Sequence, residues 1–353
     1  MKTVSSVQIL FPTLHFKQPF KIAYEEVTKI HVVTVKLTDT KGNEGLGSAS
    51  PDEEVTKENV KEVYNVLKTK LTPDFFTLPL QHIYAYHERI ATTFAGYPSA
   101  QMAVEEAVLR LYCTQNNISL VSLFGGYRDT CETLMTIGIK DTAQTIKEIK
   151  YWAKQGFKLI KLKCGINAKE DIKKILEIYP SLSTNTQLAL DANQGYSLAD
   201  AEYVLKRIAK LPIVFFEQPI SAKNVNGLKK LHLRYKTPIF ADESIVGVED
   251  GVKLLSGNFV DGINVKLMKC GGPLNFLRVF HLAKSLNKKI MIGCMYESNI
   301  SITTGAALAL ALPLDFVDLD CGHLDFKDDP TAGGALIDNG VVKMGKKQIT
   351  LTL

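Results

Sequence analysis

The segment Gln187-Leu-Ala-Leu-Asp191 is the first of four short apolar or β-branched runs that each end in a charged residue. The other three are Ile213-Val-Phe-Phe-Glu217, Pro238-Ile-Phe-Ala-Asp242 and Gly262-Ile-Asn-Val-Lys266, so the terminal charges lie 26, 25 and 24 residues apart. An interval of about 25 residues fits one strand, one helix and two short loops. Charges at the carboxyl ends of successive buried strands need a reason, because an unpaired buried charge is costly. The pattern therefore predicts a parallel barrel whose functional residues come from the carboxyl ends of several strands.

Length and composition fit such a barrel together with a second domain. The chain has 353 residues, of which 46% are hydrophobic and 22% charged, values that are ordinary for a globular protein. A barrel takes about 250 residues, which leaves room for one further domain. The formal charge of +5 includes lysine pairs that are scattered along the chain rather than grouped with aromatic residues. We therefore expect no nucleic-acid partner.

Cysteine spacing and hydropathy indicate in which cellular compartment the protein is expected. The six cysteines show no CxxC spacing and no signal-peptide pattern is seen, so we expect reduced thiols in a cytoplasmic protein. The longest apolar stretch, Gly305 to Leu314, is shorter than the roughly 20 residues that a membrane span needs. We expect this stretch to be a buried barrel helix, and we expect no membrane partner.

The order of elements changes near residue 125. Before it, alternating segments at Val4–Leu10 and His31–Leu37 are followed by helical periodicity at Val55–Leu71, Leu80–Thr93 and Ser99–Gln115. Strands first and helices after predict a small α+β capping domain over residues 1–125. The loop His15–Val27, rich in Phe and Lys, is expected to close over the site.

Strands and helices alternate through residues 126–321. Eight candidate strands are present, at Leu134–Ile139, Lys158–Lys163, Gln187–Asp191, Ile213–Glu217, Pro238–Asp242, Gly262–Lys266, Ile290–Cys294 and Asp315–Asp320. Eight alternations favour a (β/α)-barrel of the TIM type over a doubly wound sheet, for which the Gly-rich phosphate fingerprint is also missing. Residues 322–353 read as a loop and short strands that return to the capping domain.

The three carboxylates Asp191, Glu217 and Asp242 would end adjacent strands of this barrel. Neighbouring carboxylates repel one another, and a hard divalent cation relieves the repulsion. All three are oxygen donors, with no Cys or His at equivalent positions, which favours Mg²⁺ over Zn²⁺. We therefore predict one Mg²⁺ site per subunit.

Lysines flank this trio along the chain. Lys161 and Lys163 end the second strand and point to the same face, because side chains two apart in a strand do so. Lys266 ends the sixth strand, which is opposite the second in a ring of eight. A substrate between them would have a lysine on each face, and we expect crowded cations and the metal to lower a lysine pKa so that a neutral amine can act as a base.

Asp318 and Asp320 end the eighth strand with the same two-residue spacing. They lie away from the metal-binding strands. We expect this pair to offer negative charge to a cationic group of the substrate, with a helix-capping loop pair as the alternative.

The motifs that contain these residues resemble those of the enolase superfamily, in particular the muconate-lactonizing-enzyme subgroup and its dipeptide epimerases. The matching segments are Lys161-Leu-Lys163, Asp191-Ala-Asn-Gln194, Glu217-Gln-Pro219, Ala241-Asp-Glu-Ser244, Asn264-Val-Lys-Leu-Met-Lys269 with Gly271-Gly272, and Gly293-Cys-Met-Tyr-Glu297. They run through the whole predicted barrel. The resemblance implies that a substrate carboxylate binds Mg²⁺ and that the proton α to it is abstracted, as in other enzymes of this superfamily.

The resemblance implies a role for each residue. Asp191, Glu217 and Asp242 become the Mg²⁺ ligands, Lys163 and Lys266 become the acid/base pair, and Lys161 becomes an electrostatic partner of the carboxylate. Asp318 and Asp320 then bind the free α-ammonium group of a dipeptide. Thr136 and Tyr296 are expected to face the ligand as well.

One segment departs from the family pattern. Epimerases that act on Ala-Glu carry an arginine in a Phe-Lys-x-Ala-Arg context, whereas this chain has Phe20-Lys-Ile-Ala-Tyr24. Tyr24 cannot neutralise a carboxylate, and the alternative role for it is packing on the cap. We therefore expect epimerisation of an Ala-X dipeptide in which X is apolar or small and polar.

Three other activities found on the same scaffold remain alternatives: N-acyl amino acid racemase, o-succinylbenzoate synthase and cycloisomerase. A non-catalytic barrel protein is a remote alternative, which loss of the trio or of a lysine would mark. Neither loss is seen. The oligomeric state is open, and a homo-oligomer is compatible with the sequence.

Overall fold

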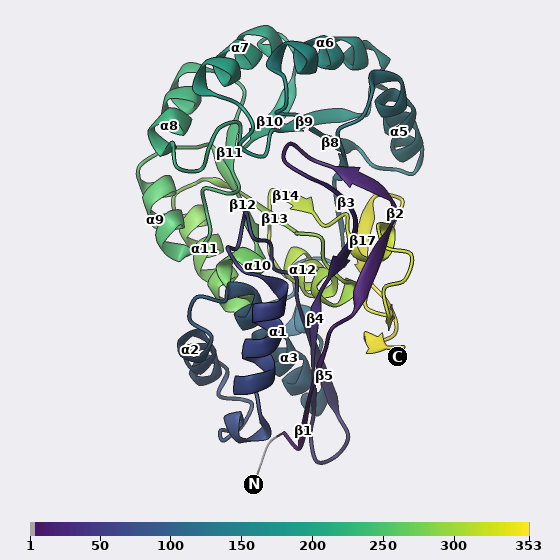
Figure 1. Cartoon of the computed structure of the whole chain (residues 1–353), viewed down its shortest axis with the longest axis vertical. Helices are drawn as coiled ribbons and strands as arrows, with labels where there is room; N and C mark the ends of the chain where they lie inside the picture. Colours follow the sequence, from purple (N-terminus) through teal and green to yellow (C-terminus); the bar gives the residue numbers. More distant parts are fainter. Residues whose placement is uncertain (1–3, 353) are drawn as a thin grey trace.

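The computed structural model describes residues 4–352 and joins an α+β cap to an eight-stranded barrel (Figure 1). The antiparallel cap sheet has the order β1 (Ser6–Leu10), β4 (Val33–Thr38), β5 (Glu44–Ala49). The helices that follow it are α1 (Val60–Lys70), η1 (Pro73–Phe75), α2 (Ile83–Thr93), α3 (Pro98–Asn116) and α4 (Leu120–Leu123). Sheet and helices share an apolar core that is separate from that of the barrel.

Helix α1 begins five residues later than the periodicity predicts. The Asp52 side chain accepts hydrogen bonds from the backbone N–H groups of Glu54 and Val55, at 2.8 and 2.9 Å, and thereby forms a turn. Asn59 then caps the helix by accepting from the N–H of Lys61. Local side-chain bonds therefore compete with the helix over the first residues of the apolar pattern.

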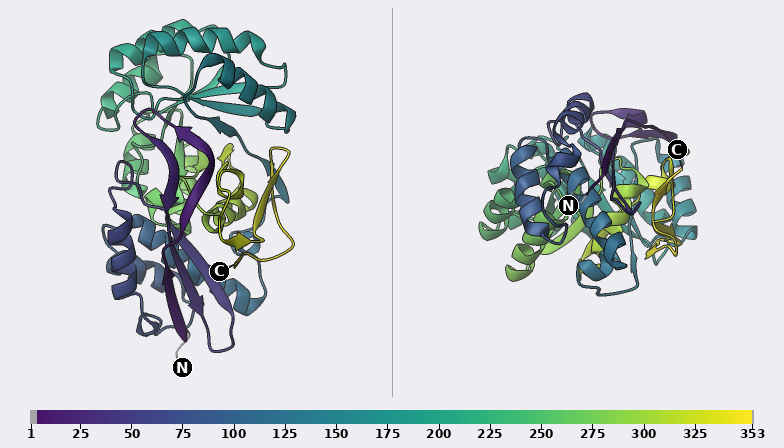
Figure 2. Two further views of the ribbon diagram at one scale, coloured as in Figure 1. Left: turned by 45° about the vertical axis from the view of Figure 1, so that its right-hand side comes forward. Right: turned by 90° about the horizontal axis from the view of Figure 1, so that it is seen from below.

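A β-hairpin projects from the cap toward the barrel (Figure 2). It consists of β2 (Thr13–Lys21) and β3 (Glu26–His31), which pair only with each other as a sheet. The strand predicted over His31–Leu37 corresponds to β4, which begins two residues later at Val33, because His31 ends β3. Alternate residues of β4 face the cap core, whereas β3 leaves the cap to form the hairpin.

The barrel contains the eight predicted parallel strands in sequential order. They are β7 (Met135–Ile137), β8 (Leu159–Lys163), β9 (Gln187–Asp191), β10 (Ile213–Glu217), β11 (Ile239–Ala241), β12 (Gly262–Lys266), β13 (Lys289–Gly293) and β14 (Phe316–Asp318). The N–H of Leu134 donates to the carbonyl of Val317 at 2.9 Å, which joins the first strand region to the last. Strands β7 and β14 are shorter than expected, and the Asp320 side chain, beyond the end of β14, accepts from the N–H of Thr136 in β7 at 2.5 Å.

Helices alternate with these strands and begin at the expected caps. They are α5 (Thr142–Lys154), α6 (Ala168–Ile178), η2 (Tyr179–Ser181), α7 (Leu198–Ile208), α8 (Val225–Arg234), α9 (Val248–Ser256), α10 (Leu267–Cys270), α11 (Pro273–Ser285) and α12 (Asn299–Ala311). Asp141 and Ser197 accept from N–H groups of the first turns of α5 and α7. Helix α12 is buried along its whole length. Within residues 4–352, no helix has both the length and the apolar character needed to cross a membrane.

The barrel interior below the site is filled by aromatic rings. The Phe215 ring lies 4.7 Å from that of Phe240 and 5.2 Å from that of Phe316. Side chains two apart in a strand point to the same face. Phe215 therefore supports Glu217 from below, and the other two rings occupy the same position in their strands.

The C-terminal segment holds the hairpin in place. It comprises η3 (Gly322–Leu324), β15 (Thr331–Ala332), β16 (Ala335–Asp338), β17 (Val341–Met344) and β18 (Thr350–Leu351), and β17 pairs with β6 (Thr130–Glu132). The N–H of Lys17 in β2 donates to the carbonyl of Asp325 at 2.7 Å. The His15 ring also contacts the Asp328 carboxylate at 2.6 Å. Hairpin and segment therefore form one layer over the barrel.

Helix α3 packs so closely on β5 that Gly47 cannot carry a side chain. A Cβ atom there would lie 1.8 Å from the carbonyl oxygen of Ala103. We expect Gly47→Ala to lower the free energy of unfolding by about 1–3 kcal/mol, the usual range for overpacking, measured by denaturant unfolding. Gly251→Ala is the control, because its Cβ would meet only ordinary contacts at 3.6 Å. An equal effect of both substitutions would contradict this packing argument.

Candidate active site

The strand ends bring the predicted lysines to one cavity. The barrel lines it with residues that include Thr136, Lys161, Lys163, Lys266, Asp318 and Asp320. The cap closes it with Phe20, Ile22, Tyr24, Glu25, Asp52 and Val55. The trio Asp191, Glu217 and Asp242 lies beneath this lining, at most 1% exposed. The structure thus gathers the predicted residues around one space between cap and barrel.

Each outer carboxylate of the trio holds one of the two proposed acid/base lysines. The Lys163 Nζ lies 2.6 Å from Oδ2 of Asp191, and the Lys266 Nζ lies 2.9 Å from Oδ2 of Asp242. Strands β8 and β12 are four apart in the order of eight, so these lysines approach from opposite sides. Glu217, on β10, lies midway between the two lysine-bearing strands.

Lys161 is surrounded by carboxylates. Its Nζ lies 2.5 Å from Oδ2 of Asp318, 3.2 Å from Oε2 of Glu217 and 3.7 Å from Oδ2 of Asp191. It therefore links the β14 side of the site to the trio. Asp318, expected to bind a substrate cation, has one of its oxygens committed to this lysine.

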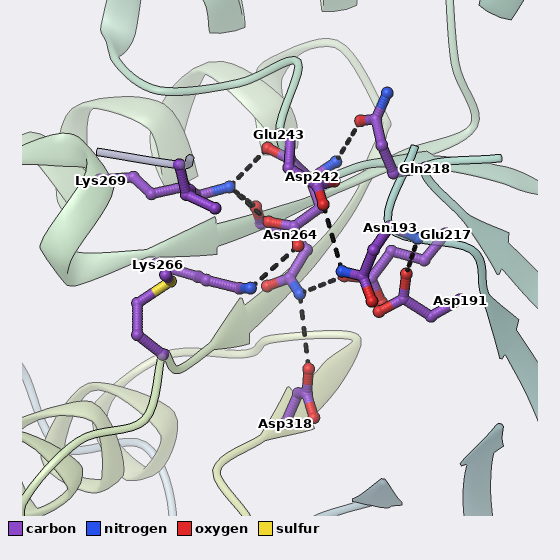
Figure 3. Close-up of polar contacts among 12 residues, drawn as sticks. Asp191, Asn193, Glu217, Gln218, Asp242, Glu243, Asn264, Lys266, Lys269 and Asp318 are labelled. Carbon is purple, nitrogen blue, oxygen red and sulfur yellow. Dashed lines mark hydrogen bonds and ion pairs between the residues drawn. The ribbon is translucent and has the colours of Figure 1, made fainter. Parts of the chain in front are cut away.

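A second set of buried polar residues holds the carboxylates in place (Figure 3). The Lys269 Nζ lies 2.5 Å from Oδ1 of Asp242, and Lys269 is only 2% exposed. The Asn264 amide donates to Oε1 of Glu217 at 2.7 Å. Gln218 fixes the backbone, because its Oε1 accepts from the N–H of Asp242 at 3.0 Å. These residues position the trio.

Asn193 connects one lysine to a further carboxyl group. Its Oδ1 accepts from the Lys163 Nζ at 2.8 Å, and its amide donates to Oε1 of Glu243 at 3.1 Å. The roles of Asn193, Glu243, Asn264 and Lys269 were not predicted from the sequence. The only signal was their place in the matching motifs, because Asn264 lies two residues before Lys266 in the same strand.

Burial and mutual repulsion shift the pKa values of the carboxylic acids in the site. Burial, with Asp191 and Asp242 nearby, raises the pKa of Glu217 to about 8 despite the opposing effect of Lys161. Burial, with Asp242 and Asp191, raises the pKa of Glu243 to about 7. Burial also acts on Asp242, but Lys266 and Lys269 outweigh it, so its pKa lies well below the usual value.

The expected lowering of a lysine pKa is not found for Lys161 and Lys266. Burial alone would lower the pKa of Lys266, but Asp242 and Glu217 raise it by more, to well above the usual value. Asp318 and Glu217 do the same for Lys161. The prediction relied on neighbouring cations and on the metal, whereas the raised pKa values reflect the carboxylates that each ammonium group faces at close range.

The donor set of the site fits a divalent cation. Around the trio, six carboxylic acids face four lysines, so full ionisation of these ten groups leaves two negative charges in excess: Asp191, Glu217, Asp242, Glu243, Asp318 and Asp320 against Lys161, Lys163, Lys266 and Lys269. Glu25, Asp52 and Asp325, which also line the cavity, are further acids. The trio offers only oxygen, which Mg²⁺ prefers. Within residues 4–352, no three acidic, His or Cys side chains are gathered closely enough to hold a metal as they stand. Lys161 contacts both Asp191 and Glu217, and Lys163 and Lys266 each contact one outer carboxylate, so a bound cation would compete with these lysines for the carboxylate oxygens.

The remaining predicted residues also line the cavity. Thr136 binds Asp320 through its backbone N–H, and its hydroxyl lies 3.4 Å from Oδ1 of Asp318. The buried Tyr296 hydroxyl interacts with the Glu25 carboxyl group of the cap. Tyr24 reaches the cavity from the hairpin turn and remains 41% exposed.

Comparison with protein families defines the class of this chain. Residues 5–125 match the mandelate racemase / muconate lactonizing enzyme N-terminal domain, and residues 144–348 match the enolase C-terminal domain-like family. The chain belongs to the mandelate racemase / muconate lactonizing enzyme family. This confirms the superfamily predicted from the motifs.

Individual relatives narrow the class. The chain is 33% identical to the L-Ala-D/L-Glu epimerase of Clostridium acetobutylicum, covering 92% of this chain and 91% of that protein. It is 31% identical to the L-Lys-D/L-Arg epimerase of Desulforapulum autotrophicum, covering 96% and 95%. The dipeptide epimerase of Enterococcus faecalis, solved with Mg and the dipeptide L-Leu-L-Tyr, has a TM-score of 0.93 at 28% identity, covering 97% of each chain. The predicted capped barrel and the predicted enzyme class, an isomerase, are thereby confirmed.

Proposed function

We propose that this chain is a Mg²⁺-dependent dipeptide epimerase that inverts the α-carbon of the second residue. The observation that carries the proposal is the pair of opposed lysines above three buried carboxylates, Lys163 from β8 and Lys266 from β12. The similarity to epimerases named for acidic and for basic dipeptides supports the reaction without fixing the side chain. From Tyr24 alone, the second residue is expected to be apolar or small and polar.

The two lysines perform the proton transfers in this mechanism. One ammonium-bearing side chain, once deprotonated, removes the α-proton from its face of the substrate, and the other donates a proton to the opposite face. The chemistry that Mg²⁺ on Asp191, Glu217 and Asp242 supplies when bound is neutralisation of the negative charge that develops on the substrate carboxylate. With the carboxylates engaged in this way, the lysines lose partners that hold them protonated.

Asp320 is proposed to bind the substrate's free amino group. It is 9% exposed and lines the cavity, and its Oδ2 accepts from the Thr136 N–H. Asp318 supports it from the same strand end, although Lys161 occupies one of its oxygens. A cationic amino terminus would relieve the repulsion between the two aspartates. The cap hairpin with Phe20 excludes water above the substrate.

The test is hydrogen exchange with a dipeptide library in D₂O, read by mass spectrometry. Deuterium is expected at the α-carbon of the second residue of dipeptides that have a free amino terminus. N-acetylation, or Asp320→Asn, is expected to weaken transition-state binding by roughly 2–5 kcal/mol, because a desolvated ion pair is lost. The substitution should have little effect on N-acetylated substrates, which serve as the internal control. If N-acyl amino acids exchange as fast as dipeptides, the protein is an N-acyl amino acid racemase instead.

A further inference from the structure

The cap side of the cavity carries acidic groups that the proposed mechanism does not use. Glu25 lies in the turn between β2 and β3, and Asp52 follows β5 directly. Both line the same cavity as Lys163 and Lys266. Asp52 is held in place because its Oδ1 accepts two backbone N–H groups. These are fixed acids at the mouth of the site.

These acids form no close ion pair within residues 4–352, although Lys163 and Lys266 act on Glu25 and Glu243 from a longer distance. The Oε1 atom of Glu25 is buried, and the Tyr296 hydroxyl, a neutral group, interacts with this carboxyl group. Glu243 faces the same cavity, is only 7% exposed, and its Oε2 atom has no hydrogen-bond partner among the described residues. In the part of the chain from residue 4 to residue 352, no Lys, Arg or His nitrogen lies within 4.0 Å of a carboxylate oxygen of Glu25, Asp52 or Glu243. Buried carboxylates without a counter-ion are costly, and a bound cation removes that cost.

The position of these acids assigns them to the side chain on the inverted carbon. Burial and the nearby Asp52 raise the pKa of Glu25, and Lys163 is close enough to oppose the shift. Tyr24 interacts electrostatically with Lys266 as well as with Asp52 and Glu243. Glu25, Asp52 and Glu243 line the cavity together with both proton-transfer lysines, and Asn193 links Glu243 to Lys163. The proposed amino-terminal site, Asp320, is instead bonded to Thr136.

The walls beside the acids suit a long aliphatic stem. Tyr24, Ile22 and Val55 line the cavity from the cap. The Phe20 ring packs edge-on against Tyr296, with ring centroids 5.9 Å apart. Aromatic and aliphatic walls that end in carboxylates fit a side chain whose methylene groups are apolar and whose tip is charged.

We propose that the residue this enzyme inverts is basic, a lysine or arginine whose cation binds Glu25, with Asp52 and Glu243 adding negative potential. This inference rests on the proposed dipeptide epimerase function and names its substrate class. It replaces the apolar or small polar side chain expected from Tyr24 alone, because Tyr24 lines the cavity together with these three acids.

The sharpest test compares L-Ala-L-Lys with L-Ala-L-norleucine, whose side chain has the same four methylene or methyl carbons and no ammonium group. We expect kcat/KM for α-hydrogen exchange to be at least about tenfold higher for lysine, the modest end of the range for a partly desolvated ion pair. Glu25→Gln should lower the lysine-to-norleucine ratio by about tenfold or more. A ratio of two substrates cancels any general loss of activity in the variant. Glu26→Gln is the matched control, because Glu26 is the next residue, exposed and outside the cavity lining.

The outcomes separate this inference from the proposed function. Norleucine exchanging as fast as lysine in the unaltered protein overturns the basic substrate and leaves the epimerase standing. A lysine preference that Glu25→Gln does not change overturns the role of Glu25, and Asp52→Asn with the same readout then tests its neighbour. If no dipeptide in the library exchanges its α-hydrogen, the proposed function and this inference are both overturned.

Discussion

Lys163→Ala and Lys266→Ala are each expected to abolish net epimerisation but to retain α-hydrogen exchange for one of the two epimers. In each variant the remaining lysine can still remove a proton and return it on its own face. Each variant should therefore exchange the α-hydrogen of one epimer with D₂O, and the two variants should act on opposite epimers. The loss of net inversion should be at least the roughly 10²–10⁴-fold typical of losing a general base.

This expectation rests on where the two lysines are anchored. Lys163 is held by Asp191 and Asn193 at the end of β8, and Lys266 is held by Asp242 at the end of β12. The two strands face each other across the barrel, so neither ammonium group can reach the face served by the other. A single mobile base would need a different geometry.

Lys158→Ala is the control for these substitutions. Lys158 directly precedes β8 but has a 63% exposed side chain paired with Glu132 at the barrel's surface. Its loss should leave both exchange and inversion unchanged, since exposed ion pairs contribute at most about 1 kcal/mol to stability. Substantial inversion that survives in Lys163→Ala or Lys266→Ala would show that one base suffices, and the surviving partner would then act only through its charge.

The barrel strands could be predicted closely from the sequence because a charged residue marks the end of several of the apolar runs. Strands β9, β10 and β12 end at Asp191, Glu217 and Lys266 as predicted, where an apolar run stops at a charge. Burial on both faces makes these strands continuously apolar, so their bounds are visible without knowledge of the partners. The spacing then places the charges at one end of the sheet.

The hairpin could not be predicted in the same way. Strand β2 buries only Leu14 and Phe16, and its following residues are mostly exposed, so no alternating pattern marks it as a strand. Its stability comes from β3 and from the C-terminal segment, which lies more than 300 residues away along the chain. Glu25, at its turn, consequently carried no signal of facing a cavity.

The directions of the pKa shifts within the site could not be predicted from the sequence either. Motifs named the lysines and carboxylates, but the sign of a pKa shift depends on which neighbour is nearest. Lys266 lies 2.9 Å from Asp242, and Lys161 touches Asp318, a residue from a distant strand. Distances of this kind decide whether a lysine pKa is raised or lowered, and they cannot be read from the spacing of residues along the chain.

Removal of Mg²⁺ is expected to abolish activity, and added Mg²⁺ to restore it. Glu217→Gln is expected to weaken transition-state stabilisation by at least about 2.7–4 kcal/mol, the loss typical of one oxyanion stabiliser. The reason is the position of Glu217, fully buried between Asp191 and Asp242 in a site where carboxylic acids outnumber lysines. A glutamine keeps the volume and can still accept from the Asn264 amide, but it does not carry the charge that a divalent cation requires.

Thermal unfolding gives a readout that does not depend on turnover. A ligand that binds only the folded state raises the apparent stability, by about 2.7 kcal/mol at a concentration 100 times its Kd. Added Mg²⁺ should therefore raise the melting temperature of the unaltered protein and have a much smaller effect on Glu217→Gln. Glu249→Gln is the control, because Glu249 is exposed in the first turn of α9 and away from the cavity, so it should respond to Mg²⁺ as the unaltered protein does. Full exchange activity in excess chelator, together with a melting temperature that Mg²⁺ does not move, would show that the three carboxylates are neutralised by the lysines alone.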